Sequence, residues 1–199
     1  MKSILVILLL LNLASCATQR VMSKDIIYMN KGNILTPSNV NKISWDSVNQ
    51  GFVYQIARSN SGDSKPHTVL TYKLIKVENK RYYFDTYENN ELVNSGNVMY
   101  KNGKLFMRYG DKIFKQFLPF KGCELILGEC EFTGFKTKKV KMITSFKDGV
   151  WINKYSNPGY SNRTITIRSV YDRLGLLLYK HTIVASSTLP IDSITTRLK

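Results

Sequence analysis

The stretch HTVLTYKLIKVENKRYYFDTYENNELVNSGNVMYKNGKLF, residues 67–106, alternates apolar and polar side chains between short turns. Successive side chains of a β-strand point to opposite faces, so residues two apart share a face. Leu70, Tyr72 and Leu74 therefore lie on one face of an expected strand, with polar residues on the other. This period of two predicts half-buried strands rather than helices.

Pairs of residues that favour tight turns separate these strands. Asn102-Gly103 is the clearest pair, because both residues tolerate the positive φ that a type I′ hairpin requires. The other pairs are Asn79-Lys80, Asn89-Asn90, Gly110-Asp111, Asp148-Gly149 and Leu174-Gly175. Strands joined by such short turns pair with their neighbours along the chain, which predicts an antiparallel meander.

The same alternation continues toward the C-terminus. In RTITIRSVYD, residues 163–172, Ile165, Ile167 and Tyr171 face one way. We expect an all-β fold of about ten strands, with a first short strand at 25–29. An open sheet of this size leaves edges and one face uncovered, so we expect closure into a barrel, or a strongly curved sheet or sandwich. The 12 Tyr and 9 Phe can fill such an interior or line a pocket.

The N-terminus has the features of an export signal. Lys2 precedes an apolar run at 4–11, which is shorter than the roughly 20 residues needed to span a bilayer. The next residues, Leu13-Ala14-Ser15-Cys16, resemble the lipobox of bacterial lipoproteins. This resemblance covers only the start of the chain. It implies removal of residues 1–15 as a signal peptide and attachment of diacylglycerol to Cys16; an ordinary signal peptide with an incidental cysteine is the alternative.

The resemblance also implies a location. Residues 16–24 become a lipidated N-terminus and tether, and residues 25–199 form a single β domain, because no linker divides them. Ala17 rather than Asp after the lipidated cysteine implies anchoring in the outer membrane, facing the periplasm or the cell surface. In a Gram-positive host the anchor would lie on the outer face of the plasma membrane.

The chain is strongly basic, with 29 Lys and Arg against 14 Asp and Glu and a formal net charge of +15. Such a balance favours anionic partners, which for an exported protein are an anionic envelope lipid or polymer. Nucleic acid is not expected as a partner, because the sequence has no helix-turn-helix pattern and no aromatic RNA-binding motif. The alternative is that the lysines only solvate the outer faces of the strands.

Cys123 and Cys130 are expected to form a disulfide. Outside the cytoplasm two thiols tend to oxidise, and lipidation of Cys16 leaves an even number. The enclosed loop, ELILGE, is unusually apolar. Its apolar residues either tuck under the sheet as a plug or protrude and contact lipid or an envelope protein; they are Leu125, Ile126 and Leu127. Redox catalysis is disfavoured, because catalytic dithiols are separated by only two residues.

No set of residues predicts catalysis, a metal site or a cofactor. The two histidines, His67 and His181, are too few for a His-rich zinc site, and there is no HExxH motif, GxSxG motif or glycine-rich phosphate loop. Carboxylates that a hydrolase could pair are Asp85, Glu88, Glu124, Glu129 and Glu131. In a chain with twice as many basic residues, we expect these acids to be mainly solvated ion-pair partners.

These observations favour a membrane-anchored envelope lipoprotein without catalytic activity, whose β domain contacts or maintains other envelope components. The first alternative is a carrier of an apolar ligand, a lipid or a lipoprotein, in a concave β cavity. That function requires a void of about 300 Å3 or more. The second alternative is an envelope hydrolase, which requires a histidine within hydrogen-bond reach of a nucleophile or acid in a cleft.

Overall fold

The structure is a computed structural model that describes residues 26–28, 30–60, 63, 65–101, 104–109, 113–116, 123–133, 139–157, 163–185 and 191–198. The predicted signal peptide (1–15) and tether (16–24), including Cys16, lie outside these residues. Within the described ranges, no helix is both long enough and apolar enough to cross a membrane.

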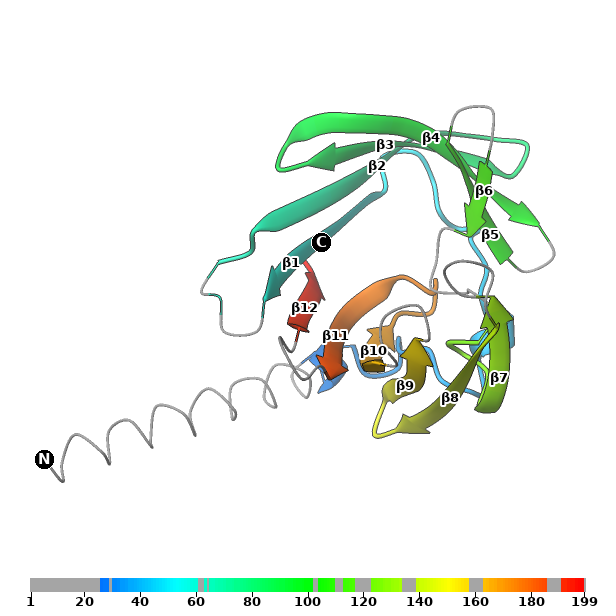
Figure 1. The fold of residues 1–199 in the computed structure, drawn as a ribbon. Helices are drawn as coiled ribbons and strands as arrows, with labels where there is room; N and C mark the ends of the chain where they lie inside the picture. The colour runs from blue at the N-terminus through cyan, green and yellow to red at the C-terminus, as the bar shows by residue number, and fades with distance from the viewer. Residues whose placement is uncertain are drawn as a thin grey trace, which may run out of the picture.

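The described residues form a single antiparallel sheet, which confirms the predicted all-β fold (Figure 1). Its strands are β1 Val53–Asn60, β2 Thr68–Glu78, β3 Arg81–Glu88, β4 Glu91–Lys101, β5 Lys104–Tyr109, β6 Ile113–Gln116, β7 Gly128–Thr133, β8 Lys139–Lys147, β9 Val150–Asn157, β10 Arg163–Tyr171, β11 Leu177–Ala185 and β12 Ile191–Arg197. A 3-10 helix, Val40–Lys42, precedes β1.

The strand order is β6-β5-β4-β3-β2-β1-β12-β11-β10-β9-β8-β7. Within β1–β6 and within β7–β12 each strand pairs with its sequence neighbour, as the turn pattern predicts. The first and last strands then pair at the centre, while β6 and β7 form the two edges. The sheet is therefore open, and the barrel form of the prediction is wrong. The curved form describes it, because β2–β4 and β8–β10 lie opposite each other in Figure 1.

The hairpin turns have the backbone geometry that their residues favour. Both residues have positive φ at Asn79-Lys80 (49° and 58°), Asn89-Asn90 (48° and 74°) and Asp148-Gly149 (52° and 82°). This is the requirement of a type I′ turn. The pairs Asn102-Gly103 and Gly110-Asp111 lie outside the described residues.

The main core lies on the concave face, and residues 34–52 run across it before β1. In Figure 1 this blue-to-cyan segment passes from the lower half of the sheet to the upper half. Trp45, only 1% exposed, donates its indole N–H to the carbonyl of Leu174 (2.9 Å) and accepts a hydrogen bond from Tyr82 Oη at its own carbonyl (2.9 Å). Trp151 Nε1 donates to the carbonyl of Leu35 (2.9 Å). The segment thus joins the two halves.

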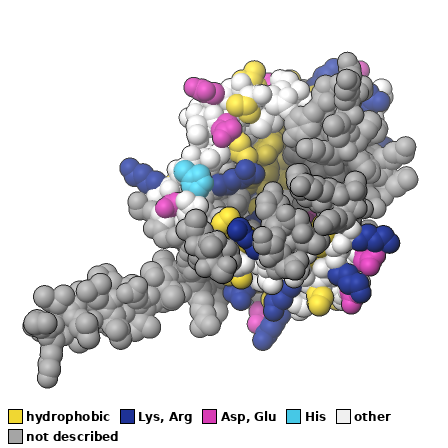
Figure 2. Space-filling model, in the orientation of Figure 1, with side chains coloured by type: hydrophobic (Ala, Val, Ile, Leu, Met, Phe, Trp, Pro, Cys, Tyr) yellow, Lys and Arg dark blue, Asp and Glu magenta, His cyan; other side chains and the backbone are white. Residues whose placement is uncertain are grey.

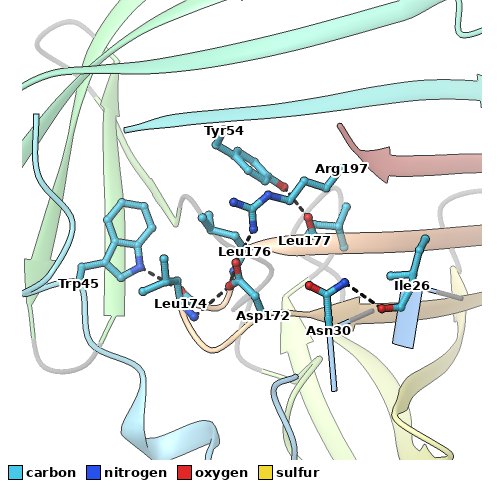
Figure 3. Close-up of polar contacts among 9 residues, drawn as sticks. All are labelled: Ile26, Asn30, Trp45, Tyr54, Asp172, Leu174, Leu176, Leu177 and Arg197. Atoms are coloured by element: carbon cyan, nitrogen blue, oxygen red, sulfur yellow. Dashed lines mark hydrogen bonds and ion pairs between the residues drawn. The ribbon is translucent and has the colours of Figure 1, made fainter. Parts of the chain in front are cut away.

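The expected strand at 25–29 is wrong for its described part, since Ile26–Tyr28 is helical. Both the backbone N–H and the side-chain amide of Asn30 donate to the carbonyl of Ile26, at 3.1 and 2.8 Å (Figure 3). These bonds close a helical turn that the apolar run alone does not reveal. Ile26 and Ile27 pack against a second, smaller core that includes Val170 and Tyr179.

Candidate ligand-binding cavity

A cavity of about 530 Å3 lies on the concave face of the sheet. Its lining comes from β1, β2 and β7–β11, together with the loop before β7. This volume exceeds the void of about 300 Å3 that ligand carriage requires and falls within the range of small-molecule sites. The cavity is therefore large enough for a carried ligand.

Most of the lining is aromatic or aliphatic. The aromatic residues are Tyr54, Tyr72, Phe132, Tyr155 and Tyr171. The aliphatic residues are Ile56, Met142, Ile167 and Leu177. Phe132 and Tyr155 meet edge to face with ring centroids 5.6 Å apart, while Tyr54 and Tyr72 stack at 5.7 Å. Such pairs hold large apolar surfaces in fixed positions.

Strand alternation explains why these residues meet. Ile167 and Tyr171, which the sequence placed on one face of β10, both line the cavity. In the antiparallel register Ile167 pairs with Asn153 of β9, and Met142 of β8 pairs with Tyr155. Directly paired residues present their side chains on the same face of a sheet. The lining therefore forms because every second residue of these neighbouring strands points to the same face of the sheet.

Two basic residues share this inner face. Arg58 of β1 and Lys180 of β11 both pair with Thr195 of the intervening strand β12. The three residues thus form one row, in which two strand spacings separate Arg58 from Lys180 by roughly 10 Å between Cα atoms. In Figure 2 Lys and Arg side chains adjoin the hydrophobic surface inside the hollow of the molecule.

The loop between the cysteines is fixed over the same face. Cys123 and Cys130 lie at disulfide distance with Cα atoms 5.5 Å apart, as predicted. Thr144 Oγ1 donates to the carbonyl of Cys123 (3.0 Å), and Asn153 Nδ2 donates to that of Glu124 (2.9 Å). Buried side chains of β8 and β9 therefore hold the start of the loop.

The apolar residues of this loop divide between the two predicted roles. Leu125 is 7% exposed and belongs to the main core, as a plug residue would. Ile126 and Leu127 are 51% and 52% exposed, as a contact site would require. The turn from Cys123 to Ile126, whose backbone N–H donates to the Cys123 carbonyl (3.2 Å), separates the inward side chain from the outward ones.

Asn153 also gives the cavity a buried hydrogen-bond acceptor. Its side-chain amide nitrogen donates to Glu124 and to Thr144 Oγ1 (2.8 Å), which fixes the orientation of the amide. Its Oδ1 is buried and has no hydrogen-bond partner among the residues that the structure describes. A buried acceptor without a partner costs free energy, so a donor in the cavity would stabilise this arrangement.

Three tyrosines of the lining, Tyr54, Tyr155 and Tyr171, have raised pKa values and stay protonated at neutral pH. Burial raises the pKa of Tyr155 and of Tyr171, and the nearby Glu124 carboxylate raises both pKa values further. Burial also raises the pKa of Tyr54, whose hydroxyl donates to the carbonyl of Leu177 (3.2 Å, Figure 3). The phenol groups therefore add polar but uncharged atoms to the cavity, and Glu124 lies on the side of Tyr155 and Tyr171.

A buried ion pair borders the cavity. Asp172 Oδ2 accepts a hydrogen bond from Arg197 Nη1 (2.6 Å), and Oδ1 accepts from the backbone N–H groups of Leu174 and Leu176, both at 2.9 Å (Figure 3). Burial raises the pKa of Asp172, although the Leu176 N–H and Arg197 lower it. The Arg197 guanidinium also lies 5.4 Å from the centre of the Tyr54 ring. This pair joins the end of β12 to the turn before β11.

The chain has no significant match to any protein-family model, curated protein or solved structure.

The two histidines lie outside the cavity. His67 is exposed and faces Asp63 (3.5 Å), and His181 pairs with Asp192 beside Ile194 on the outer face of β11 and β12. Neither histidine lines the cavity. Across the described residues, no group of three or more His, Cys, Asp or Glu side chains is placed to hold a metal ion.

The carboxylates that a hydrolase could use are also dispersed. Asp85 accepts a hydrogen bond from Ser95 (2.6 Å), while Glu129 and Glu131 form exposed ion pairs with Lys141 (2.8 Å) and Lys139 (3.6 Å). Glu88 is exposed at the end of β3. Among these acids, Glu124 alone lines the cavity described above.

Sequence reasoning missed Arg58, Lys180 and Asn153 as cavity residues. A signal was present, because Arg58 follows Tyr54 and Ile56 at intervals of two and therefore shares their face. Lys180 was harder to assign, since the register shifts between β10 and β11 at Tyr171. A basic residue at an inward position of an apolar strand was the available clue.

Proposed function

We propose that this protein is a lipid-anchored envelope protein whose β domain binds an apolar ligand in the concave cavity. The cavity of about 530 Å3, lined mainly by aromatic and aliphatic side chains, is the observation that supports this function. It favours the carrier interpretation over contact with envelope components alone, because a domain that acted only through its outer surface would not need a void of this size.

Burial of an acyl chain in the cavity would contribute several kcal/mol to ligand binding. Burial of one methylene contributes about 0.8 kcal/mol, so an acyl chain that buries about ten methylenes gains roughly 8 kcal/mol before the costs of association. Micromolar binding needs a net free energy of about 8 kcal/mol, so further contacts must offset the association cost. Additional contacts of the chain with the aromatic lining offset part of the association cost. A lipid or a single acyl chain is therefore the class of ligand that suits the cavity.

The N-terminal lipobox resemblance supports a membrane location for this binding. A lipid on Cys16 and a tether of residues 17–24 would keep the start of the β domain within about 30 Å of the bilayer that supplies apolar ligands. We assign the anchor to the outer membrane on the basis of Ala17.

The ligand-binding proposal is tested by blocking the cavity. Ile167→Trp adds bulk at a lining position that is 9% exposed, and Ile143→Trp makes the same change at a position of β8 that is 59% exposed. The mature protein and both variants are extracted from membranes, and the lipids that co-purify are quantified by mass spectrometry. We expect about a tenfold loss of bound lipid in Ile167→Trp and no change in Ile143→Trp. Equal lipid content in all three proteins would contradict ligand binding in the cavity.

The anchoring proposal is tested separately with Cys16→Ser. We expect this variant to lose the mass of the diacylglycerol group and to remain unprocessed at the lipobox, because the modified thiol is missing. Intact-mass spectrometry of the membrane-extracted protein provides the measurement. A wild-type protein with an unmodified Cys16 would contradict anchoring through this residue.

A further inference from the structure

We infer that the ligand of the cavity is an amphiphile with an anionic headgroup, which Arg58 and Lys180 bind while its apolar chain extends toward β7–β9. This inference rests on the proposed function and adds the chemical class of the ligand.

The position of the two cations supports this assignment. Arg58 and Lys180 line the cavity from β1 and β11, on either side of Thr195 in β12. They therefore lie near the centre of the sheet, whereas Phe132 and Met142 line the cavity from β7 and β8 at one edge. The two cations thus line one part of the cavity and the apolar side chains of β7 and β8 line another, which gives separate places for an anionic headgroup and an apolar chain.

The acids near the cavity do not outnumber its two cations. Asp172 is already paired with Arg197, and Asp192 faces His181 on the outer side of the sheet. Glu124 also lines the cavity, and its charge acts on Tyr155 and Tyr171 of β9 and β10. Among the described lining residues, two cations and one carboxylate give the cavity a net positive charge, with the cations grouped in one row.

The chemistry of these side chains fits a carboxylate or a phosphate. A guanidinium presents forked N–H donors to two oxygens of one anion, while an ammonium group acts as a mobile point charge. The hydroxyl of Thr195, in the same row, offers a further donor on this face. A free fatty acid would supply a carboxylate, and a single-chain phospholipid would supply a phosphate.

The test compares headgroups on one chain in the mature protein, reconstituted in phosphatidylcholine vesicles. Three photoreactive probes carry the same 16-carbon diazirine chain and end in a carboxylate, a lysophosphatidate phosphate or an uncharged methyl ester. Labelling of peptides from the cavity-lining strands is measured by mass spectrometry over a range of probe concentrations. We expect the carboxylate probe, the phosphate probe or both to label the cavity about tenfold more strongly than the ester, and the stronger of the two identifies the source of the anion.

Two matched double variants test whether Arg58 and Lys180 cause the preference for anionic probes. Arg58→Gln with Lys180→Gln removes both cavity cations, whereas Lys154→Gln with Arg168→Gln removes two exposed cations whose register places them on the outer face of β9 and β10. We expect the cavity variant to lose about tenfold in labelling by the preferred anionic probe and to keep its labelling by the ester. The outer variant is expected to label as the wild type does.

The outcomes separate the two proposals. If all three probes label the cavity equally in the wild type, or if the two double variants lose equal labelling, the headgroup inference is wrong while ligand binding in the cavity stands. If no probe labels the lining peptides, the proposed function fails and the headgroup inference fails with it.

Discussion

The two faces of the sheet are built by the same strands, yet basic residues have different surroundings on the two faces. On the outer face Lys73 and Lys76 are exposed and lie over the rings of Tyr87 and Tyr83, at 4.4 and 4.5 Å from the ring centroids. On the concave face Arg197 is paired with a buried carboxylate. A basic residue facing water needs no explanation, whereas one facing a mainly apolar interior requires a partner or a function.

The largest expected difference between the faces concerns Trp45. Trp45→Ala removes an indole that is 1% exposed, together with its hydrogen bond to Leu174, and should lower the free energy of unfolding by about 3–5 kcal/mol. Urea unfolding followed by circular dichroism measures the change. The outer-face control Tyr83→Ala should cost much less, because its ring is only partly buried. Equal losses would mean that the buried Trp45 indole contributes no more to stability than a partly buried ring on the outer face.

The next prediction concerns the buried ion pair and depends on pH. Arg197→Met leaves the Asp172 carboxylate without its cation, which should destabilise the fold toward the lower end of about 3–5 kcal/mol near neutral pH, because the Arg197 side chain is 22% exposed. Burial already raises the pKa of Asp172, and loss of Arg197 should raise this pKa further.

The sign of the pH dependence follows from proton linkage. A raised folded-state pKa means that the contribution of Asp172 to stability is highest below the unfolded value of about 3.9 and declines as pH rises through the folded-state pKa. The deficit of Arg197→Met should therefore be small near about pH 4 and large near about pH 7. Urea unfolding at both pH values measures it. In an Asp172→Asn background the loss of stability caused by Arg197→Met should vary little with pH. If this loss were independent of pH while Asp172 is present, the ion pair between Asp172 and Arg197 would not be its cause.

The smallest predicted effect concerns the disulfide that closes the loop at the cavity. Replacing Cys123 and Cys130 by Ala should lower stability by about 2.5 kcal/mol, since the disulfide restricts an eight-residue loop of the unfolded chain. Urea unfolding without reductant measures the loss. As a control, dithiothreitol should destabilise the wild type and leave the double variant unchanged. A double variant as stable as the oxidised wild type would show that Asn153 and Thr144 hold the loop without the covalent bond.

Features that depend on neighbours in the chain were predictable. The faces of β2 and β10 and the turns at Asn79-Lys80, Asn89-Asn90 and Asp148-Gly149 follow from local rules, namely the period of two and the tolerance for positive φ. The pairing of Cys123 with Cys130 also joins residues close in sequence. The error at Ile26–Tyr28 is local as well, because the Asn30 amide closes this turn by a hydrogen bond that the apolar run does not indicate.

The candidate site was predictable only in part. Alternation places Ile167 and Tyr171 on one face, but it does not show that this face encloses a cavity. Arg58 and Lys180 lie far apart in the chain and become neighbours of Thr195 only because β12 inserts between β1 and β11. The same insertion brings Arg197 to Asp172.

The sequence by itself determined that this chain forms antiparallel hairpins with one apolar face, because side-chain alternation and turn residues act over a few positions. The tertiary structure decided that the first and last strands pair at the centre, that the edges at β6 and β7 stay open, and that a void remains on the concave face. These features depend on contacts between segments more than 100 residues apart, such as Trp45 with Leu174 and Trp151 with Leu35. Such contacts depend on the packing of whole layers, and no local pattern of residues specifies them.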